Sequence, residues 1–140
     1  MSRAREAFAQ HLATIEDGTH LLMQLPVRDV PSRSGLSMEI DVLPHLTNPR
    51  GGLQGGLIAT VADMVAGRIL LDALPEGSMC ATVDLSVHYL TSLDAPVARF
   101  DGRIARMGGR LAVIQVDVFN EGSDALAAIC TLTFSLTRAG

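Results

Sequence analysis

A single acidic residue in the middle of a long apolar segment is the strongest candidate for chemistry in this chain. Residues 51–67 read GGLQGGLIATVADMVAG, and Asp63 is the only charged residue among them. In a helix it would share one face with four small residues, because the five follow the spacing i, i+3, i+4, i+7 and i+8: Ala59, Ala62, Asp63, Ala66 and Gly67. A face of small residues lets a ligand, a backbone or a second subunit approach the carboxylate.

A buried carboxylate needs a partner or a function, because burying even a neutral polar group without a partner costs roughly 2 to 7 kcal/mol. Asp63 is also too far from the start of the apolar segment to cap a helix N-terminus. Two interpretations remain. Asp63 is a catalytic carboxylate in a cleft, or it pairs with Arg68 or with an arginine of a partner subunit.

The glycines before Asp63 add a second element of a possible site. A helix beginning near Gly55 and Gly56 would present unpaired N–H groups and the positive end of its dipole. Glycine has no side chain to block a ligand from that backbone, and such N–H groups can hold a developing oxyanion. Asn48 and Gln54 add amide donors nearby. With Asp63 these groups indicate acyl transfer; a tightly packed loop is the alternative explanation of the glycines.

The elements that would position these residues follow from hydrophobic periodicity and from turn residues. The pattern predicts an amphipathic helix ended by Gly18, a loop, a first strand, a long apolar helix and four further strands: 3–16, 26–35, 36–43, 57–74, 79–90, 97–106, 111–119 and 125–136. Short turns force the later strands to pair antiparallel, and strands of this length must twist and curl. We therefore expect one domain over residues 1–140, with an N-terminal helix and loop over 1–35. Its fold class is α+β, a curled antiparallel sheet of about five strands around one long buried helix.

Composition excludes several classes of protein. A formal net charge of −4 argues against nucleic acid as a partner. No uncharged apolar run is long enough to span a membrane, and the first residues lack a signal-peptide core, so we expect a cytoplasmic protein. Cys80 and Cys130 form no CxxC pair and are expected to be reduced thiols. The four histidines show no metal-ligand spacing, and we expect neither a metal nor a cofactor.

Over residues 36–137 the chain resembles the hotdog-fold acyl-CoA thioesterases of the phenylacetate-pathway and 4-hydroxybenzoyl-CoA type. That family has an asparagine, a His-Gly-Gly six residues later, and an acid eight residues beyond the first of those glycines. Here the matching residues are Asn48, Gln54-Gly55-Gly56 and Asp63. The later segments TVDLSVHYL and GGRLAVIQVDVFN also resemble the strands of the family. Gln54 replaces the histidine, so it can donate a hydrogen bond but cannot carry a proton in turnover.

The resemblance implies a hotdog fold and hydrolysis of an acyl-CoA thioester in a homodimer or a dimer of dimers. The thioester carbonyl would lie against the N–H of Gly55, with Asn48 or Gln54 assisting. Asp63 would attack the carbonyl or activate water, in a site shared with the other subunit's glycines. Thr82 would position the acid or the water, although an ordinary strand residue is an equal reading of Thr82. An apolar pocket between subunits would take the acyl group.

Two arginines are further candidates for binding the substrate. Arg106 and Arg110 flank the Gly108-Gly109 turn, where they would either hold a CoA phosphate or form solvated ends of a hairpin.

Without the histidine, the chain could instead be a non-catalytic acyl-CoA or fatty-acyl binding protein. A structural oligomer, with Asp63 in an interface ion pair, is the remaining alternative.

Overall fold

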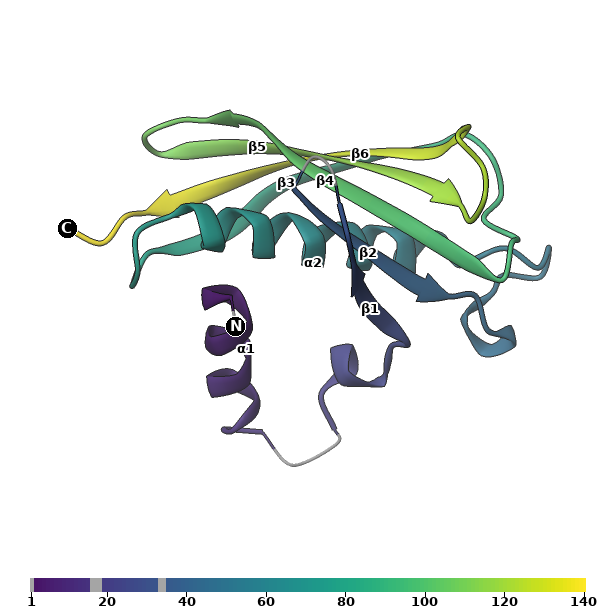
Figure 1. The fold of residues 1–140 in the computed structure, drawn as a ribbon, viewed down its shortest axis with the longest axis horizontal. Coiled ribbons are helices and arrows are strands. Elements are labelled where there is room, and N and C mark those ends of the chain that lie inside the picture. Colours follow the sequence, from purple (N-terminus) through teal and green to yellow (C-terminus); the bar gives the residue numbers. More distant parts are fainter. Residues whose placement is uncertain (1, 16–18, 33–34) are drawn as a thin grey trace.

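The computed structural model describes residues 2–15, 19–32 and 35–140 (Figure 1). The elements follow in the order α1 (Arg3–Leu12), η1 (Leu21–Gln24), β1 (Val27–Val30), β2 (Leu36–Asp41), η2 (Pro44–Leu46), α2 (Gly55–Ala73), β3 (Met79–Tyr89), β4 (Val97–Met107), β5 (Leu111–Asn120) and β6 (Leu126–Thr137). The long helix and the four later strands lie within two residues of their predicted bounds.

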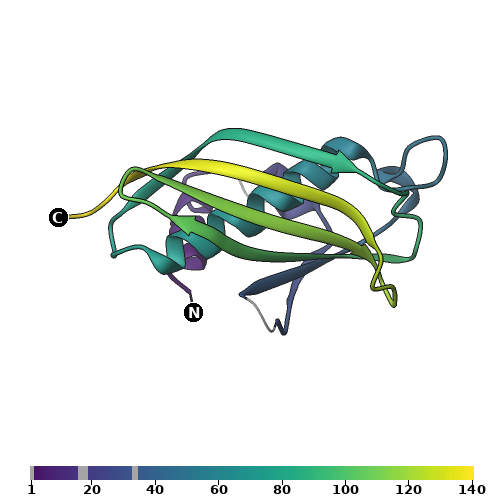
Figure 2. The ribbon, with the colours of Figure 1, turned by 90° about the horizontal axis from the view of Figure 1, so that it is seen from above.

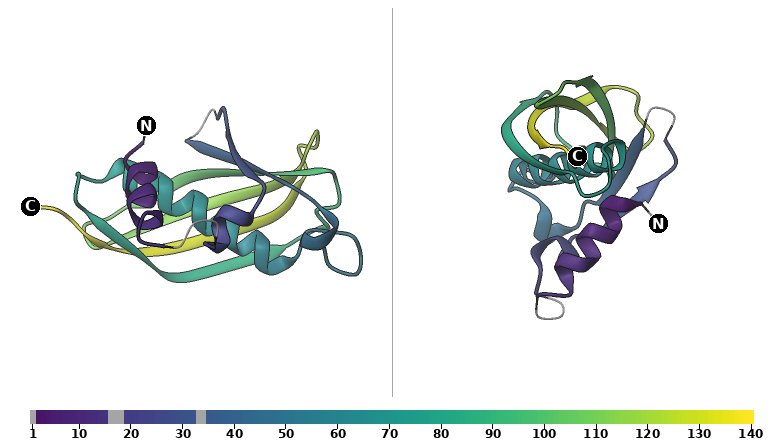
Figure 3. Two further views of the ribbon diagram at one scale, coloured as in Figure 1. Left: turned by 90° about the horizontal axis from the view of Figure 1, so that it is seen from below. Right: turned by 90° about the vertical axis from the view of Figure 1, so that its left-hand side faces the viewer.

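The six strands form one antiparallel sheet in the order β1-β2-β4-β5-β6-β3. The sheet curls around α2, and the view along the helix shows the strands arching over it (Figures 2 and 3). This arrangement confirms the predicted α+β hotdog fold. The strand β3, which immediately follows α2, lies at one edge of the sheet.

The loop predicted over residues 26–35 is wrong in part, because Val27–Val30 forms the sixth strand, β1. This strand has four residues, and its pairing with β2 is reinforced by side chains. Arg28 forms ion pairs with Glu39 (3.2 Å) and Asp41 (2.8 Å). So short a strand beside Pro26 has little periodicity of its own, and its stability comes from contacts with residues that are remote in the sequence.

The N-terminal helix is shorter than predicted, ending at Leu12 rather than at residue 16. Gly18, which was expected to end it, lies outside the described residues. Helix α1 begins at the N-cap Ser2, whose side chain accepts a hydrogen bond from the N–H of Arg5 (3.2 Å). Figure 3 shows α1 on the side of α2 that faces away from the sheet.

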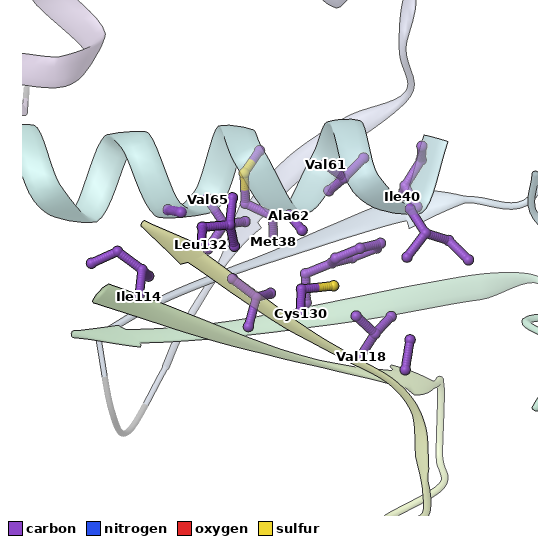
Figure 4. Close-up of a cluster of buried hydrophobic side chains, with 14 of the residues drawn as sticks. Met38, Ile40, Val61, Ala62, Val65, Ile114, Val118, Cys130 and Leu132 are labelled. Carbon is purple, nitrogen blue, oxygen red and sulfur yellow. The ribbon is translucent and has the colours of Figure 1, made fainter. Parts of the chain in front are cut away.

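The core lies between α2 and the concave face of the sheet. The helix buries one row of aliphatic side chains against it, formed by Ile58, Val61, Ala62, Val65, Ala66 and Leu70. Figure 4 shows Val61 and Val65 facing Ile114, Val118 and Leu132 of the sheet. Because all of these side chains are aliphatic, this row holds α2 against the sheet by packing alone, and Asp63 and Arg68 lie outside it.

Candidate active site

The carboxylate of Asp63 accepts a hydrogen bond from a side chain of the edge strand. Thr82 Oγ1 donates to Asp63 Oδ1 at 2.7 Å. Asp63 is partly exposed rather than fully buried, so the carboxylate expected inside the protein faces an accessible space. No other group in the described residues binds this carboxylate, which leaves Oδ2 free for a ligand.

The proposed pairing of Asp63 with Arg68 within one chain is wrong. Arg68 instead donates to both carboxylate oxygens of Asp29 on β1. Arg5 of α1 binds the same carboxylate at 2.6 Å. The Arg68 guanidinium beside Asp29 holds the pKa of that carboxyl below its ordinary value. Asp63 therefore has no cationic partner in the described part of its own chain.

A β-bulge brings Thr82 to Asp63. Strict alternation along residues 79–90 would put Thr82 on the opposite face of the strand from Leu85 and Val87. The pairing of β3 with β6 shifts between Thr82 and Asp84, so Val83 is the extra residue, and 57% of it is exposed. Beyond the bulge the alternation resumes one residue out of phase. Thr82 then shares the helix-facing side of β3 with Leu85 and Val87, which pack on the core.

The start of α2 is held by a second residue of β3. The hydroxyl of Tyr89 donates to the carbonyl oxygen of Gly55 at 2.8 Å. A Cβ atom on Gly55 would lie 3.2 Å from the same ring, so the ring and the backbone are in direct contact. No group in the described residues accepts a hydrogen bond from the N–H of Gly55 or Gly56. These two donors are open at the helix N-terminus.

The two predicted amide side chains lie in the loop before Gly55. The carboxamide oxygen of Asn48 accepts from the N–H of Arg50 (2.9 Å) and of Gly52 (3.4 Å). Gln54 is exposed, and its Nε2 donates to the carbonyl of Thr47 at 3.4 Å. Asn48 therefore braces the loop, and neither side chain reaches Asp63 within this chain.

Beside Gly55 lies a hollow of about 420 Å³, whose wall includes Asn48, Arg50, Gly56, Tyr89 and Ser92. Sequence reasoning missed Tyr89 and Arg50 as members of this region. Tyr89 could have been found from the sequence, because it lies two positions after Val87 and therefore on the same strand face as Leu85 and Val87. Nothing in the sequence distinguished Arg50 from the other arginines.

The structure does not bring Arg106 and Arg110 to Asp63 within one chain. Both are exposed at the hairpin between β4 and β5, at the end of the molecule where α2 finishes (Figure 1). The turn itself is held by Arg138, which donates to the carbonyl of Gly108 at 2.9 Å. Gly55 lies at the opposite end of α2.

Gly55 and Asp63 are too far apart to act on one carbonyl group from the same chain. Eight residues separate them along a continuous α-helix, a rise of about 12 Å. When a carbonyl group accepts a hydrogen bond from the Gly55 N–H and a nucleophile approaches its carbon atom, the amide nitrogen and the nucleophile are about 7.5 Å apart at most. This distance is the sum of the hydrogen bond, the C=O bond and the distance of approach. The described residues therefore contain two halves of the candidate site, the open N–H groups at Gly55 and the carboxylate of Asp63, about 12 Å apart along the helix.

Neither cysteine has a lowered thiol pKa. Burial raises the pKa of the Cys130 thiol to about 11. Burial, with the nearby charge of Asp63, also raises the pKa of Cys80. Among the described residues, no three His, Cys, Asp or Glu side chains gather where they could hold a metal ion. Nor does that part of the chain contain a helix long and apolar enough to cross a membrane.

Comparison with known proteins identifies the class to which this fold and site belong. The model of the thioesterase superfamily matches residues 51–127, which is more than half of the chain and includes Gly55, Asp63 and Thr82. The chain therefore belongs to the thioesterase superfamily. A comparison with curated protein sequences finds no match.

Several solved structures resemble the fold of this chain at low sequence identity. A thioesterase family protein from Silicibacter pomeroyi superposes with a TM-score of 0.80 at 21% identity, over 97% of this chain and 96% of that one. Zebrafish thioesterase superfamily member 2 gives a TM-score of 0.78 at 21% identity, over 98% and 99%. A Bacillus halodurans protein crystallised with CoA gives 0.68 at 24% identity, over 71% and 70%. At these identities the likeness concerns the fold.

Proposed function

We propose that the protein is an acyl-CoA thioesterase that hydrolyses a thioester to a carboxylate and free CoA. The observation that carries this proposal is the free carboxylate of Asp63, oriented by Thr82 and lacking a cation in the described chain. Membership of the thioesterase superfamily and the CoA bound to the Bacillus halodurans neighbour support the reaction and the substrate class.

The roles of the site residues follow from their donors and acceptors. The N–H of Gly55, open at the positive end of the α2 dipole, polarises the thioester carbonyl and stabilises the oxyanion. Gln54 and Asn48 lie beside it as supporting amides, and Gly56 leaves room for the substrate. Asp63 attacks the carbonyl or activates a water molecule; both routes use the free Oδ2.

The complete site needs two chains, because about 12 Å of helix separates Gly55 from Asp63. The edge strand β3 supplies the surface for association. An unpaired edge invites pairing with another strand, and β3 is flanked by large exposed apolar side chains: Met79 (69%), Val83 (57%), Tyr89 (57%) and Leu90 (55%). A homodimer formed through β3 sets the Asp63 of one chain near the Gly55 of its partner.

The first experiment measures thiol release from a panel of acyl-CoA esters. Replacement of Asp63 by Asn keeps the size of the side chain and one acceptor oxygen for Thr82, but removes its charge and turns the second oxygen into an NH₂ donor. We expect Asp63→Asn to remain folded and to lose about 10²- to 10⁴-fold in kcat, as for lost acid–base catalysis. Turnover close to that of the wild type would contradict the catalytic role of Asp63.

The same variant separates the proposed enzyme from a non-catalytic binding protein. A wild-type protein that binds CoA esters by calorimetry, yet releases no thiol from any of them, would be the binding protein. A structural oligomer with Asp63 in an interface ion pair predicts a different result, in which Asp63→Asn weakens association and no CoA ester binds.

A mixing experiment tests the shared site directly. Gly55→Pro removes the N–H at the first helical position, where proline is tolerated, and Gly55→Ala is its control because it adds a Cβ but keeps the N–H. Asp63→Asn and Gly55→Pro homodimers should both be inactive. After subunit exchange, half of the dimers are mixed and each holds one intact site, so about a quarter of wild-type activity should return. No recovery, with exchange verified, would contradict a site built across two chains.

A further inference from the structure

A cavity of about 660 Å³ lies between α2, the N-terminal segment and the strands β1 and β2. Five residues of α2 form its floor: Asp63, Met64, Gly67, Arg68 and Leu71. Asp63 is the first of these along the helix, so the cavity begins at the candidate catalytic carboxylate. It then extends toward the C-terminal end of α2, and residues of α1, η1 and β1 wall the opposite side.

Gly67 shows that this space is kept open. It lies inside α2, where glycine costs about 1 kcal/mol relative to alanine. Glycine is required where a neighbouring atom lies too close for a side chain. At Gly67 a Cβ atom would meet nothing within 4 Å, so no close contact requires glycine there. The described chain therefore gives no internal reason for the missing side chain. An occupant from outside the chain, one helical turn from Asp63, supplies that reason.

The arginines of the wall are already in ion pairs. Arg5 and Arg68 both bind Asp29, and Arg28 binds Glu39 and Asp41 on β2. Arg68 Nε has no hydrogen-bond partner in the described residues, but it is buried, and the guanidinium groups of all three arginines are already in ion pairs with carboxylates. Apart from Asp63 and His11, the described part of the wall therefore offers no unpaired ionisable side chain to an occupant, which favours an uncharged one.

The apolar part of the wall is flexible and mostly aliphatic. It includes Met23, Met38 and Met64 together with Leu22 and Leu71, and Phe8 is its one phenyl ring among the described residues. Methionine adapts to the shape of its neighbour, whereas an aromatic ligand gains most from stacked or edge-on rings. These side chains suit a flexible aliphatic chain.

Resting on the proposed function, we infer that this cavity binds the acyl group of the substrate, and that the acyl group is an unbranched aliphatic chain of medium length. From Asp63 to Leu71 the helix rises about 12 Å. A fully extended hydrocarbon advances about 1.25 Å per bond, so about eight to ten carbons fill the cavity from the carboxylate to its end. The N-terminal segment is thus a wall of the acyl site and sets the chain length.

The test compares straight-chain CoA esters from acetyl to palmitoyl, with benzoyl-CoA included. For the wild type, kcat/KM should rise about threefold to fourfold with each added methylene up to about ten carbons, the ratio expected for burying one methylene, and should then level or fall. Equal kcat/KM along the series, or a preference for benzoyl-CoA, would overturn the inference.

Two variants locate the acyl chain. Gly67→Leu fills the floor of the cavity and should lower kcat/KM for decanoyl-CoA at least about tenfold relative to acetyl-CoA. Ala7→Trp, which enlarges a residue of α1 in the cavity wall, should also lower kcat/KM for the longer esters only. Ala73→Leu adds the same side chain at an exposed position of α2 outside the cavity and should leave the profile unchanged. A uniform loss over all esters in both cavity variants would overturn the assignment.

Binding measurements keep this inference separate from hydrolysis. If the wild type releases no thiol from any ester, the proposed reaction fails, and calorimetry with decanoyl-CoA and acetyl-CoA tests the cavity alone. Tighter binding of decanoyl-CoA that is lost in Gly67→Leu supports the acyl site, and equal affinities overturn it. A shift of Gly67→Leu to a smaller oligomer in sedimentation would instead assign the cavity to a second copy of the chain.

Discussion

The hydroxyl of Tyr89 donates a 2.8 Å hydrogen bond to the carbonyl of Gly55, across the gap between the edge strand and the start of α2. This bond holds the peptide that joins Gly55 to Gly56, which carries the open N–H of Gly56 and directly follows the peptide that carries the N–H of Gly55. Tyr89 is therefore a positioning residue for the proposed oxyanion site rather than a catalytic one.

Loss of that hydroxyl should lower kcat with little change in KM. Tyr89→Phe keeps the ring against Gly55 and removes a hydrogen bond worth about 1 kcal/mol, so we expect a fall in kcat of about fivefold. Tyr89→Leu, which also removes the ring, should cost more. The readout is steady-state kinetics with an acyl-CoA ester, with circular dichroism to verify the fold. A Tyr89→Phe enzyme with unchanged kcat would remove this role.

The hydroxyl group of Thr82, rather than the shape of its side chain, should be required for full activity. Thr82→Val has nearly the same volume but cannot donate to Asp63, whereas Thr82→Ser can. We expect kcat to fall about tenfold in the valine variant, the cost of one hydrogen bond to a charged group, and to stay near wild type in the serine variant. Equal activity in all three proteins would make Thr82 an ordinary strand residue.

The pattern of residues predicted the long helix and the four later strands, because each of these signals is local and periodic. The predicted face of small residues around Asp63 is wrong in part, because Ala62 and Ala66 are buried in the core. The contact between Thr82 and Asp63 could not be derived in this way. Strict alternation puts Thr82 on the wrong face, and only the bulge at Val83 corrects it. A bulge is one extra residue in a strand, which leaves both flanking patterns intact and gives no local signal.

Long-range pairing explains the other differences. The strand β1 and the binding of Arg68 by Asp29 both depend on residues brought together from separate parts of the chain. Asp29 lies in a segment rich in proline and serine, which by composition is a loop. The alternative interpretation of Asp63 paired it with Arg68, five residues away, because a sequence shows proximity along the chain but not in space.

The carboxylate of Asp29 should make the protein sensitive to acid. Its pKa is held below the ordinary value of 3.8, chiefly by the hydrogen bond from Arg68. The unfolded chain therefore takes up a proton at a higher pH than the folded chain does. The stabilisation is fully present above about pH 5 and is lost as the pH falls through the lowered pKa.

Chemical denaturation at a series of pH values measures this effect. The free energy of unfolding should fall more steeply below about pH 4 in the wild type than in Asp29→Asn, which has no proton to take up at this position. Asp124→Asn, at an exposed turn position, is the matched control and should follow the wild type. Parallel curves for the wild type and Asp29→Asn would contradict the role of this ion pair.

Arg50 is the cation best placed to meet a CoA phosphate near Gly55, since it lines the hollow beside that residue. Arg50→Ala should raise KM for an acyl-CoA several-fold and weaken the dependence of KM on salt. Arg106→Ala and Arg110→Ala test whether the hairpin of a partner chain contributes as well. Arg103→Ala, which removes an ion pair with Asp117, is a control for loss of positive charge. An unchanged KM in Arg50→Ala would exclude that contact.

Substitution of Gln54 tests whether its side chain helps to polarise the thioester carbonyl in the proposed reaction. Its side chain is exposed and binds only the Thr47 carbonyl in the described chain, at 3.4 Å, so it is free to turn toward a substrate. If it donates to the thioester oxygen, Gln54→Ala should lower kcat by up to about 10²- to 10³-fold, as for one lost oxyanion donor. If the Gly55 N–H supplies most of the stabilisation, the loss should be small.

The variant Gln54→His restores the residue of the resembling thioesterases and tests the same position from the other direction. Imidazole can donate to the carbonyl as the amide does, so activity should be equal or higher. Gln54→Glu is the matched control, because it keeps the size of the side chain but puts a negative charge beside the developing oxyanion and should lower kcat. The measurement is kcat for one ester across the three proteins. A Gln54→Glu enzyme as active as the wild type would show that this side chain points away from the carbonyl, and Gly55 would then be the principal donor.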